Sequence, residues 1–239
     1  MDWHDYDAAL FDLDGVLTPT AEVHMRAWRE LFTDYLTLKG ETSRPYVESD
    51  YFEFIDGKPR YDGVRDMLAS RGLTLAEGDP SDPADADTVC GLGNRKNDFF
   101  AAALAGEGVD AYPGSVALLD HLAAAGTKVA VVSSSKNAPA VLEAAGLADR
   151  FDVVVDGQVA TDAGLPGKPA PDTYLEGARR LGVDPARAVV FEDAVSGVRA
   201  GHDGGFGLVV GVDRGVGADR LTEGGADLVV TDLAELVGA

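Results

Sequence analysis

The sequence has almost no cysteine and no long hydrophobic run. One cysteine, Cys90, stands among 239 residues, so no intrachain disulfide can form, and we expect a reducing, cytoplasmic setting. We expect Cys90 to be a small, partly buried residue rather than a nucleophile. No Cys/His cluster has the spacing of zinc ligands. No apolar run is long enough to span a bilayer, and the acidic residues 1–14 lack the segments of a signal peptide.

Positive charge is also scarce. The chain has 20 Lys and Arg against 41 Asp and Glu, a formal net charge of -21. Because such a surface repels nucleic acid and anionic membranes, neither is an expected partner. Four of the few lysines, at positions 58, 96, 136 and 168, lie in segments typical of loops or element ends. Together they suit an anion ligand, although each alone is better explained as a solubilising surface residue.

Short apolar runs alternate with helical patterns through most of the chain. The runs are rich in valine and mostly apolar on both faces, as buried parallel strands are. They cover residues 8–13, 128–133, 151–155, 188–193, 207–212 and 226–231. Helices are expected over 114–126, 137–147, 172–182 and 195–205. This alternation predicts an α/β fold with a doubly wound, Rossmann-like parallel sheet.

Residues 21–107 differ from the rest because they contain no convincing valine-rich strand. Helical periodicity is present over 21–36, 61–72 and 96–106, and residues 76–87 form a loop rich in Pro and Asp. We therefore predict two domains. Residues 1–20 and 108–239 form the α/β core, and residues 21–107 form a small all-helical domain inserted after the first strand.

The first predicted strand ends in two carboxylates, Asp12 and Asp14, followed by Gly15. Ligands of open α/β sheets bind beyond the carboxyl ends of the strands. Adjacent carboxylates repel, and a divalent cation such as Mg²⁺, which prefers oxygen ligands, offsets that repulsion. In an extended segment the two side chains would point to one face. A solvated Asp-Gly turn is the alternative when this motif is taken alone.

Polar segments also follow the second and third predicted strands. The run "SSSKN" (133–137) offers hydroxyl and backbone N–H groups for an anion at a strand-to-helix junction, or else a helix N-cap. Lys168 stands between Gly167 and Pro169. Prolines stiffen this loop, so the ammonium could cancel negative charge between a carboxylate and a phosphate. An exposed loop lysine is the alternative.

The fourth predicted strand ends in a second acidic pair, Glu192 and Asp193. These residues would complete a magnesium site with Asp12, or they would complement a helix dipole. Each feature has an ordinary explanation alone, but four of them follow four strands in order. Two acidic pairs, a hydroxyl-rich cradle and one lysine suit phosphoryl transfer, in which positioning and charge neutralisation carry most of the catalysis.

Four segments carry a family resemblance. In order, "FDLDGVLTPT", "VVSSSKN", "GKPAPD" and "FEDAVSG" resemble the signature motifs of the haloacid dehalogenase-like superfamily, over nearly the whole chain. The helical insert looks like that superfamily's C1-type cap. Within the superfamily, the chain is similar to the β-phosphoglucomutase-like subfamily in "TAEVHMRAW", "DGKPRYDGV", "NRKNDFF" and "SSSKN".

The resemblance implies roles for residues of the core. Asp12 would be the nucleophile that becomes an aspartyl phosphate, and Asp14 the general acid and base. Ser133 and Lys168 would hold the transferring phosphoryl group. The cofactor implied is Mg²⁺, and its ligands would be Asp12, Asp14 through the backbone carbonyl, Glu192 and Asp193.

It also implies roles in the helical insert. His24 and Lys96 match residues that couple substrate binding to cap closure. Arg60 matches the cap arginine that grips the phosphate that does not react, aided by Lys136 and Asn137. The remaining substrate-binding candidates are Thr20, Trp28 and Ser134, and Trp28 fits the role of a core residue on a helix equally well.

The resemblance implies an isomerase that converts β-glucose 1-phosphate to glucose 6-phosphate through a bound sugar bisphosphate. A sugar-phosphate phosphatase, with Asp14 activating water, and a phosphate-ester binding protein without turnover are the alternatives. We expect a monomer whose partner is a small-molecule sugar phosphate. Two features depart from the subfamily: Pro19 replaces a usual acidic residue, and the loop 76–87 adds acidic length.

Overall fold

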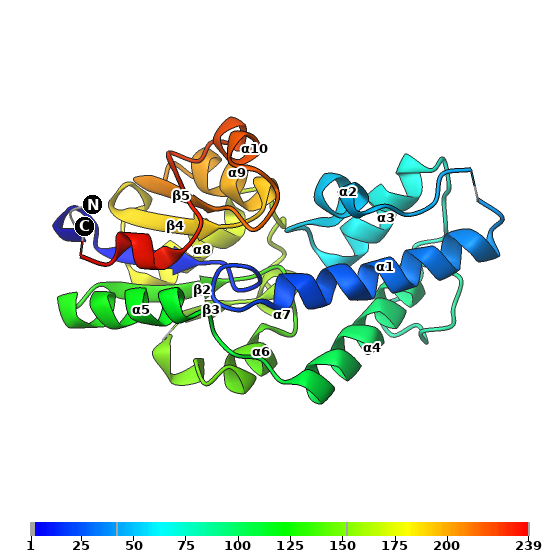
Figure 1. The fold of residues 1–239 in the computed structure, drawn as a ribbon, viewed down its shortest axis with the longest axis horizontal. Helices are drawn as coiled ribbons and strands as arrows, with labels where there is room; N and C mark the ends of the chain where they lie inside the picture. The colour runs from blue at the N-terminus through cyan, green and yellow to red at the C-terminus, as the bar shows by residue number, and fades with distance from the viewer. Residues whose placement is uncertain (1–2, 42, 152, 239) are drawn as a thin grey trace. The chain divides into compact units, whose positions relative to one another are not determined.

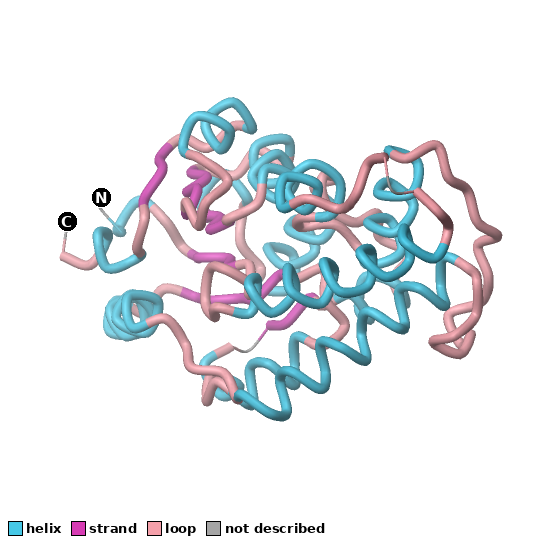
Figure 2. Tube along the Cα trace, turned by 45° about the vertical axis from the view of Figure 1, so that its right-hand side comes forward, coloured by secondary structure: helices cyan, strands magenta, loops and turns pink. Residues whose placement is uncertain are grey.

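A computed structural model describes residues 3–41, 43–151 and 153–238. The chain forms two compact units. The core unit comprises Met1–Thr20 and Val109–Ala239, and the helical unit comprises Ala21–Gly108. Figure 1 colours the chain by position, and Figure 2 shows that the strands belong to the core unit, whereas the described part of the helical unit consists of helices and loops.

The core unit contains a six-stranded sheet with every strand parallel to its neighbours. The strand order is β3-β2-β1-β4-β5-β6. All six strands predicted from the sequence are confirmed, although Asp152, in the predicted segment 151–155, lies outside the described residues. The strands are β1 (Ala8–Phe11), β2 (Lys128–Val132), β3 (Val153–Val155), β4 (Ala188–Glu192), β5 (Leu208–Val212) and β6 (Leu228–Val230).

Helices connect these strands. The four helices predicted for this unit are present with slightly shorter or shifted bounds. In the described residues they are α5 (Pro113–Ala125), α6 (Ala138–Ala144), α8 (Asp172–Leu181) and α9 (Val195–Asp203). Two more, α7 (Gly157–Asp162) and α10 (Ala218–Gly224), were not predicted. Neither has a readable apolar period. Asp156 caps the start of α7, where its side chain accepts the backbone N–H groups of Gln158 and Val159.

Helices cover both faces of the sheet. On one face, Gly177 of α8 packs against Leu10, and Gly201 of α9 packs against Val190. Because Leu10 and Val190 are register partners, α8 and α9 lie on the same side.

The opposite face carries aromatic side chains. The rings of Phe11 and Phe191 are stacked with centroids 4.6 Å apart, and Trp3 lies 6.3 Å from Phe191. Trp3 also lies 6.4 Å from the ring of His121 in α5, which places α5 on this face. The sheet is therefore doubly wound, as the sequence predicts.

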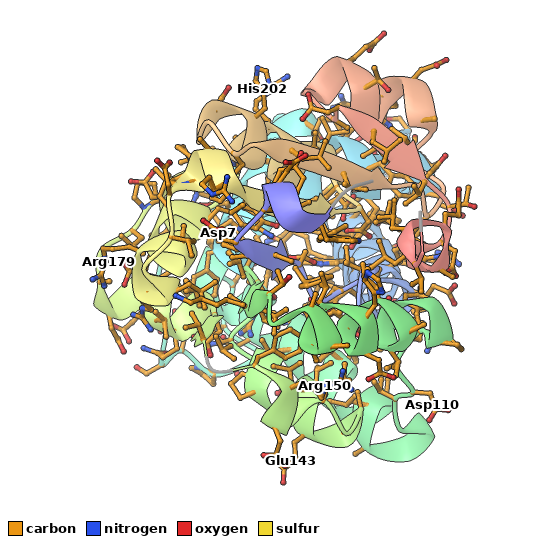
Figure 3. All side chains as sticks on the ribbon, turned by 90° about the vertical axis from the view of Figure 1, so that its left-hand side faces the viewer. Asp7, Asp110, Glu143, Arg150, Arg179 and His202 are labelled. Atoms are coloured by element: carbon orange, nitrogen blue, oxygen red, sulfur yellow. The ribbon has the colours of Figure 1, made fainter. Side chains whose placement is uncertain are left out.

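The outer surfaces of these helices are charged. Figure 3 shows Glu143, Arg179 and His202 projecting outward from α6, α8 and α9, and all three are exposed. The apolar residues of the two central strands, β1 and β4, are buried. None of the helices in the described part of the chain is long and apolar enough to cross a bilayer.

The helical unit is built around aromatic and aliphatic side chains, among them Trp28, Phe32 and Leu92. Its described helices are α1 (Thr20–Leu38), α2 (Glu48–Asp50), the π-helical turn Tyr51–Ile55, α3 (Arg60–Ser70) and α4 (Val89–Glu107). The segment 76–87 is a loop, as predicted.

One helix of this unit is longer than the sequence predicts. Helix α4 begins at Val89, whereas the pattern indicated a start at residue 96. Two glycines, Gly91 and Gly93, obscure the periodicity there. Thr88 caps the helix because its hydroxyl accepts the N–H of Gly91 at 2.9 Å.

Candidate active site

A buried lysine joins two buried carboxylates at the carboxyl ends of the strands. Asp12 follows β1, and its N–H continues the ladder to Phe191 O at 2.9 Å. Lys168 Nζ donates to Asp12 Oδ1 at 2.6 Å, to Val132 O at 3.1 Å and to Glu192 Oε1. Lys168 is 2% exposed. The interpretation of Lys168 as an exposed loop lysine is therefore wrong.

The electrostatics of this centre follow from its burial. Burial raises the pKa of Asp12 well above its usual range, and the charges of Glu192 and Asp14 add to the rise, while Lys168 opposes it. For Lys168, burial alone would lower the pKa, but the charges of Asp12 and Glu192 outweigh burial and raise it. The lysine therefore stays an ammonium ion, and any further positive charge nearby would favour the ionised form of Asp12.

Three acidic residues converge at this centre. One carboxylate oxygen from each of Asp12, Glu192 and Asp193 lies within 4.8 Å of the others. All three residues are buried. Buried carboxylate oxygens in such a group are the donor set that suits a hard divalent cation. The predicted acidic pair at the end of β4 is thus brought together with Asp12.

Two glycines make room for these carboxylates. A Cβ on Gly15 would lie 1.8 Å from Asp193 Oδ2, and a Cβ on Gly197 would lie 1.8 Å from Glu192 Oε1. Gly15 also has φ +83°, which disfavours side chains. Both glycines are in the predicted motifs, but their contact with the acids cannot be read from the sequence.

Asp14 lies beyond the end of β1, where it forms an isolated bridge with Thr18. Strand β1 ends at Phe11, and the Gly15 N–H donates to Thr18 O at 2.7 Å. Both aspartates therefore lie beyond the end of the strand, and the expectation that their side chains point to one face stays a prediction. Asp14 is half-buried, and its side chain is not among the three converging acids.

A pair of threonines orients Asp14. The hydroxyl of Thr20 donates to Asp14 Oδ1 at 2.5 Å. Since Thr20 has used its proton, the hydroxyl of Thr18, 2.7 Å away, donates to Thr20. Both threonines are fully buried. Pro19, the departure noted in the sequence, lies between them and leaves this chain of hydrogen bonds intact.

The segment after β2 forms a hydroxyl-lined turn. Ser133 is buried, and its hydroxyl accepts the N–H of Ser135 at 3.1 Å. The hydroxyl of Ser135 accepts the N–H of Asn137, the residue preceding α6. Ser134 is half-buried, whereas Lys136 is exposed and donates to Gln158 Oε1 at 3.1 Å. These hydroxyls thus organise the turn that leads into α6; the N–H groups that they accept precede the helix, so neither hydroxyl is its N-cap.

In the helical unit, Lys96 lies among aromatic rings. It is 3% exposed, its Nζ contacts His24 Nδ1, and it lies 5.2 Å from the Trp28 ring centroid and 5.0 Å from that of Phe100. His24 stacks on Phe100 with centroids 4.1 Å apart. Three predicted residues, His24, Trp28 and Lys96, therefore form one cluster, and Trp28 belongs to the core of this unit.

Arg60 forms a second cluster at the start of α3. Its Nη2 donates to Asn97 Oδ1 at 2.7 Å, and its Nη1 reaches Asn94 Oδ1 at 3.4 Å. Burial lowers the pKa of this guanidinium from its usual value. Arg60 is only half-buried, so one face of the side chain stays accessible.

Two residues of the core site have no signal in the sequence. Tyr174 of α8 is fully buried, and its hydroxyl donates to Glu192 Oε1 at 3.0 Å. Arg214 donates from Nε to Gly15 O at 2.9 Å and stacks on the Tyr112 ring. Arg214 lies 199 positions from Gly15 and Tyr174 lies 18 positions from Glu192, and only the folded structure brings each to its partner.

Parallel doubly wound sheets with acids and a lysine at the strand ends define a class of α/β enzymes. A family model of haloacid dehalogenase-like hydrolases matches residues 6–205. The chain belongs to this family.

Relatives of known description match nearly the whole chain. It is 49% identical over 239 residues to a β-phosphoglucomutase from Mycobacterium bovis, covering 96% of this chain and 91% of that protein. It is 31% identical over 229 residues to hexitol phosphatase A from Escherichia coli, covering 95% and 91%. The crystal structure of a β-phosphoglucomutase from Clostridium difficile matches with a TM-score of 0.77 and 25% identity, covering 97% and 93%.

Proposed function

We propose that this enzyme is a Mg²⁺-dependent β-phosphoglucomutase that converts β-glucose 1-phosphate to glucose 6-phosphate. The observation that carries the proposal is the buried Asp12, held by Lys168 beside Glu192 and Asp193. The 49% identity to a β-phosphoglucomutase supports the same reaction.

In the first half of the proposed reaction, Asp12 attacks the phosphorus of a sugar bisphosphate. An Asp12 oxygen forms the new bond to phosphorus while the bond to the ester oxygen breaks, and the leaving sugar oxygen takes a proton from Asp14. The product is an aspartyl phosphate on Asp12. The ammonium of Lys168, 2.6 Å from Asp12 Oδ1, offsets negative charge that develops around the phosphoryl group.

In the second half, a hydroxyl of the sugar monophosphate attacks the aspartyl phosphate. Asp14 takes the hydroxyl proton, the new ester bond forms, and the bond between phosphorus and Asp12 breaks. The threonine pair keeps Asp14 in one orientation for both proton transfers, because Thr20 donates to it at 2.5 Å. The net reaction moves a phosphoryl group and consumes no water.

Asp12, Glu192 and Asp193, with the backbone carbonyl of Asp14, are the proposed ligands of Mg²⁺. When bound, the ion would supply positive charge that favours ionised Asp12 despite its burial. Gly15 and Gly197 suit this assignment, because they give two of the three carboxylates the space to converge.

A mutase must bind two phosphates of one bisphosphate, and Arg60 is the proposed partner of the phosphate that does not react. Lys136, which is exposed, and Asn137 are its proposed helpers, and Ser133 and Ser134 the proposed donors to the reacting phosphate. Lys96 and His24 are proposed to couple substrate binding to closure, with Trp28 beside them.

A sugar-phosphate phosphatase is the second candidate, supported by the 31% identity to hexitol phosphatase A. Both reactions use the same aspartyl phosphate, and they differ in whether water or a sugar hydroxyl accepts the phosphoryl group. The deciding experiment supplies β-glucose 1-phosphate, Mg²⁺ and a trace of glucose 1,6-bisphosphate. Glucose 6-phosphate without inorganic phosphate is the expected result, and phosphate release without isomerisation would contradict the mutase.

Arg60→Ala tests the second phosphate site. The variant should lose isomerisation far more than hydrolysis of a small aryl phosphate, which has no second phosphate to bind. Equal losses in both reactions would count against this role of Arg60.

A further inference from the structure

Arg60 differs from several neighbouring arginines in the charge of its partners. In the helical unit, Arg29, Arg65 and Arg71 form ion pairs with carboxylates, as expected in a chain with 41 acidic residues. The hydrogen bonds of the Arg60 guanidinium go to the uncharged carboxamide oxygens of Asn94 and Asn97. These two bonds fix the side chain without placing a carboxylate on the guanidinium, although the charge of Asp98 also acts on it.

The orientation of the Asn94 carboxamide follows from its other partners. Its Nδ2 donates to Pro80 O at 3.1 Å and to Asp82 O at 2.9 Å. Because carbonyl oxygens only accept hydrogen bonds, the amide nitrogen must face them. The oxygen is left for Arg60 and for the hydroxyl of Tyr61, which donates to it at 3.0 Å.

Close packing of α3 on α4 sets the position of the guanidinium. A Cβ on Gly93 would lie 2.7 Å from the Tyr61 ring and 3.1 Å from Arg60 Cδ. Only a residue without a side chain lets Arg60 and Tyr61 approach α4 this closely. The glycine that obscured the start of α4 in the sequence is thus part of the Arg60 cluster.

The acidic loop 76–87 is joined to the same cluster. Besides the two hydrogen bonds from Asn94, the loop accepts one from Arg95, whose Nε donates to Ala84 O at 2.8 Å. At its other end, Asp87 accepts Lys39 Nζ at 2.7 Å and the Tyr35 hydroxyl at 3.0 Å. Asn94 therefore bridges the loop and the arginine.

We propose that Asn94 and Asn97 are positioning residues that hold Arg60 through uncharged hydrogen-bond partners for the non-reacting phosphate, and that Asn94 ties Arg60 to the loop 76–87. The proposal rests on the proposed function, in which Arg60 binds that phosphate. A carboxylate at position 97 would lie against Nη2, pair with it and compete with the phosphate.

Asn97→Asp is the direct test, since it changes charge and keeps shape. The KM for glucose 1,6-bisphosphate should rise about 10- to 100-fold, the range for loss of a charged hydrogen bond, with kcat for isomerisation little changed. Hydrolysis of p-nitrophenyl phosphate should keep its wild-type rate, which also shows that the variant folds. Ala102→Asp is the control, because it adds the same charge at an exposed position of α4.

A double variant separates positioning from general damage to the fold. If Asn97 acts through Arg60, Arg60→Ala with Asn97→Asp should be no worse than Arg60→Ala alone. Asn94→Ala should also raise the KM for the bisphosphate, by less than Asn97→Asp, because the bond to Asn97 remains.

Three results would overturn the inference. The KM for the bisphosphate could be the same in Asn97→Asp as in Ala102→Asp. The effects of Asn97→Asp and Arg60→Ala on that KM could multiply in the double variant, or Asn97→Asp could slow p-nitrophenyl phosphate hydrolysis as much as isomerisation. With an isomerising wild-type enzyme, any of these leaves the proposed function standing. If the wild-type enzyme only releases phosphate, the proposed function fails first and the inference falls with it.

Discussion

Two glycines determine where the acidic side chains of the site can lie. Gly15 abuts Asp193, and Gly197 abuts Glu192, each so closely that an added Cβ would lie 1.8 Å from a carboxylate oxygen. Arg214 also holds Gly15, because its Nε donates to the carbonyl oxygen of Gly15 at 2.9 Å. At the scale of single residues, the site thus depends on two glycines that lack a side chain as well as on the charged residues.

Gly15→Ala should therefore disable the enzyme without unfolding it. The methyl group would displace Asp193, and a displacement of this order lowers kcat by about 100-fold. Gly126→Ala is the matched control, since Gly126 has a similar φ of +72° but nothing within 4 Å of the added atom. It should cost about 1 kcal/mol of stability and leave kcat unchanged. Steady-state kinetics with β-glucose 1-phosphate distinguish the two variants, and equal kinetics would contradict the account.

At the scale of elements, sequence patterns predicted the strands and the longer helices and missed two short helices and one helix start. The six strands were predictable because each is a short valine-rich run, apolar on both faces. Helices α7 and α10 were missed because their six and seven residues are rich in Gly, Thr and charged side chains and show no apolar period. The start of α4 was hidden by Gly91 and Gly93, which pack closely against other groups.

Some residues of the candidate site were also predictable from the sequence, whereas their contacts were not. Asp12, Lys168 and Glu192 were predictable because each ends or follows a strand. Their hydrogen bonds were not, because Lys168 meets Asp12 across 156 positions of sequence. Tyr174 and Asn94 were missed because ordinary helix residues carry no local sign of what they contact.

The helical unit contains a buried ion pair that fastens α2 to the end of α3. Arg71 Nη2 donates to Asp50 Oδ2 at 2.5 Å, and both side chains are 7% exposed. Arg71 also donates to the backbone carbonyls of Arg44 and Pro45. Removing one partner of such a pair leaves a buried charge without compensation.

Asp50→Ala should lower the free energy of unfolding by about 3–5 kcal/mol. Glu48→Ala is a nearby control, because the Arg29–Glu48 pair has side chains 54% and 65% exposed and should contribute about 0–1 kcal/mol. Urea unfolding followed by tryptophan fluorescence measures both, since Trp28 lies in the core of this unit. A cost for Asp50→Ala no larger than that of Glu48→Ala would show that the pair does not fasten α3.

At the scale of the whole molecule, the net charge of -21 is the dominant electrostatic feature. A large charge of one sign destabilises the compact state through self-repulsion. Dissolved salt screens that repulsion, since the Debye length falls from about 30 Å at 0.01 M to about 10 Å at 0.1 M.

Raising NaCl across that range, with a chelator present to remove divalent ions, should therefore raise the melting temperature. Choline chloride should act in the same way, because screening depends on ionic strength and not on the identity of the cation. Differential scanning calorimetry makes the measurement. A melting temperature that falls with salt would mean that specific surface ion pairs outweigh the net repulsion.

The central claim is that Asp12 carries the phosphoryl group, and chemical trapping tests it most directly. Sodium borohydride reduces an aspartyl phosphate to homoserine, so the enzyme is mixed with glucose 1,6-bisphosphate and Mg²⁺, quenched with borohydride, digested and analysed by mass spectrometry. Homoserine at position 12 and unmodified Asp14 in the same peptide are the expected result. Conversion at Asp14, or no conversion in an enzyme that turns over, would contradict it.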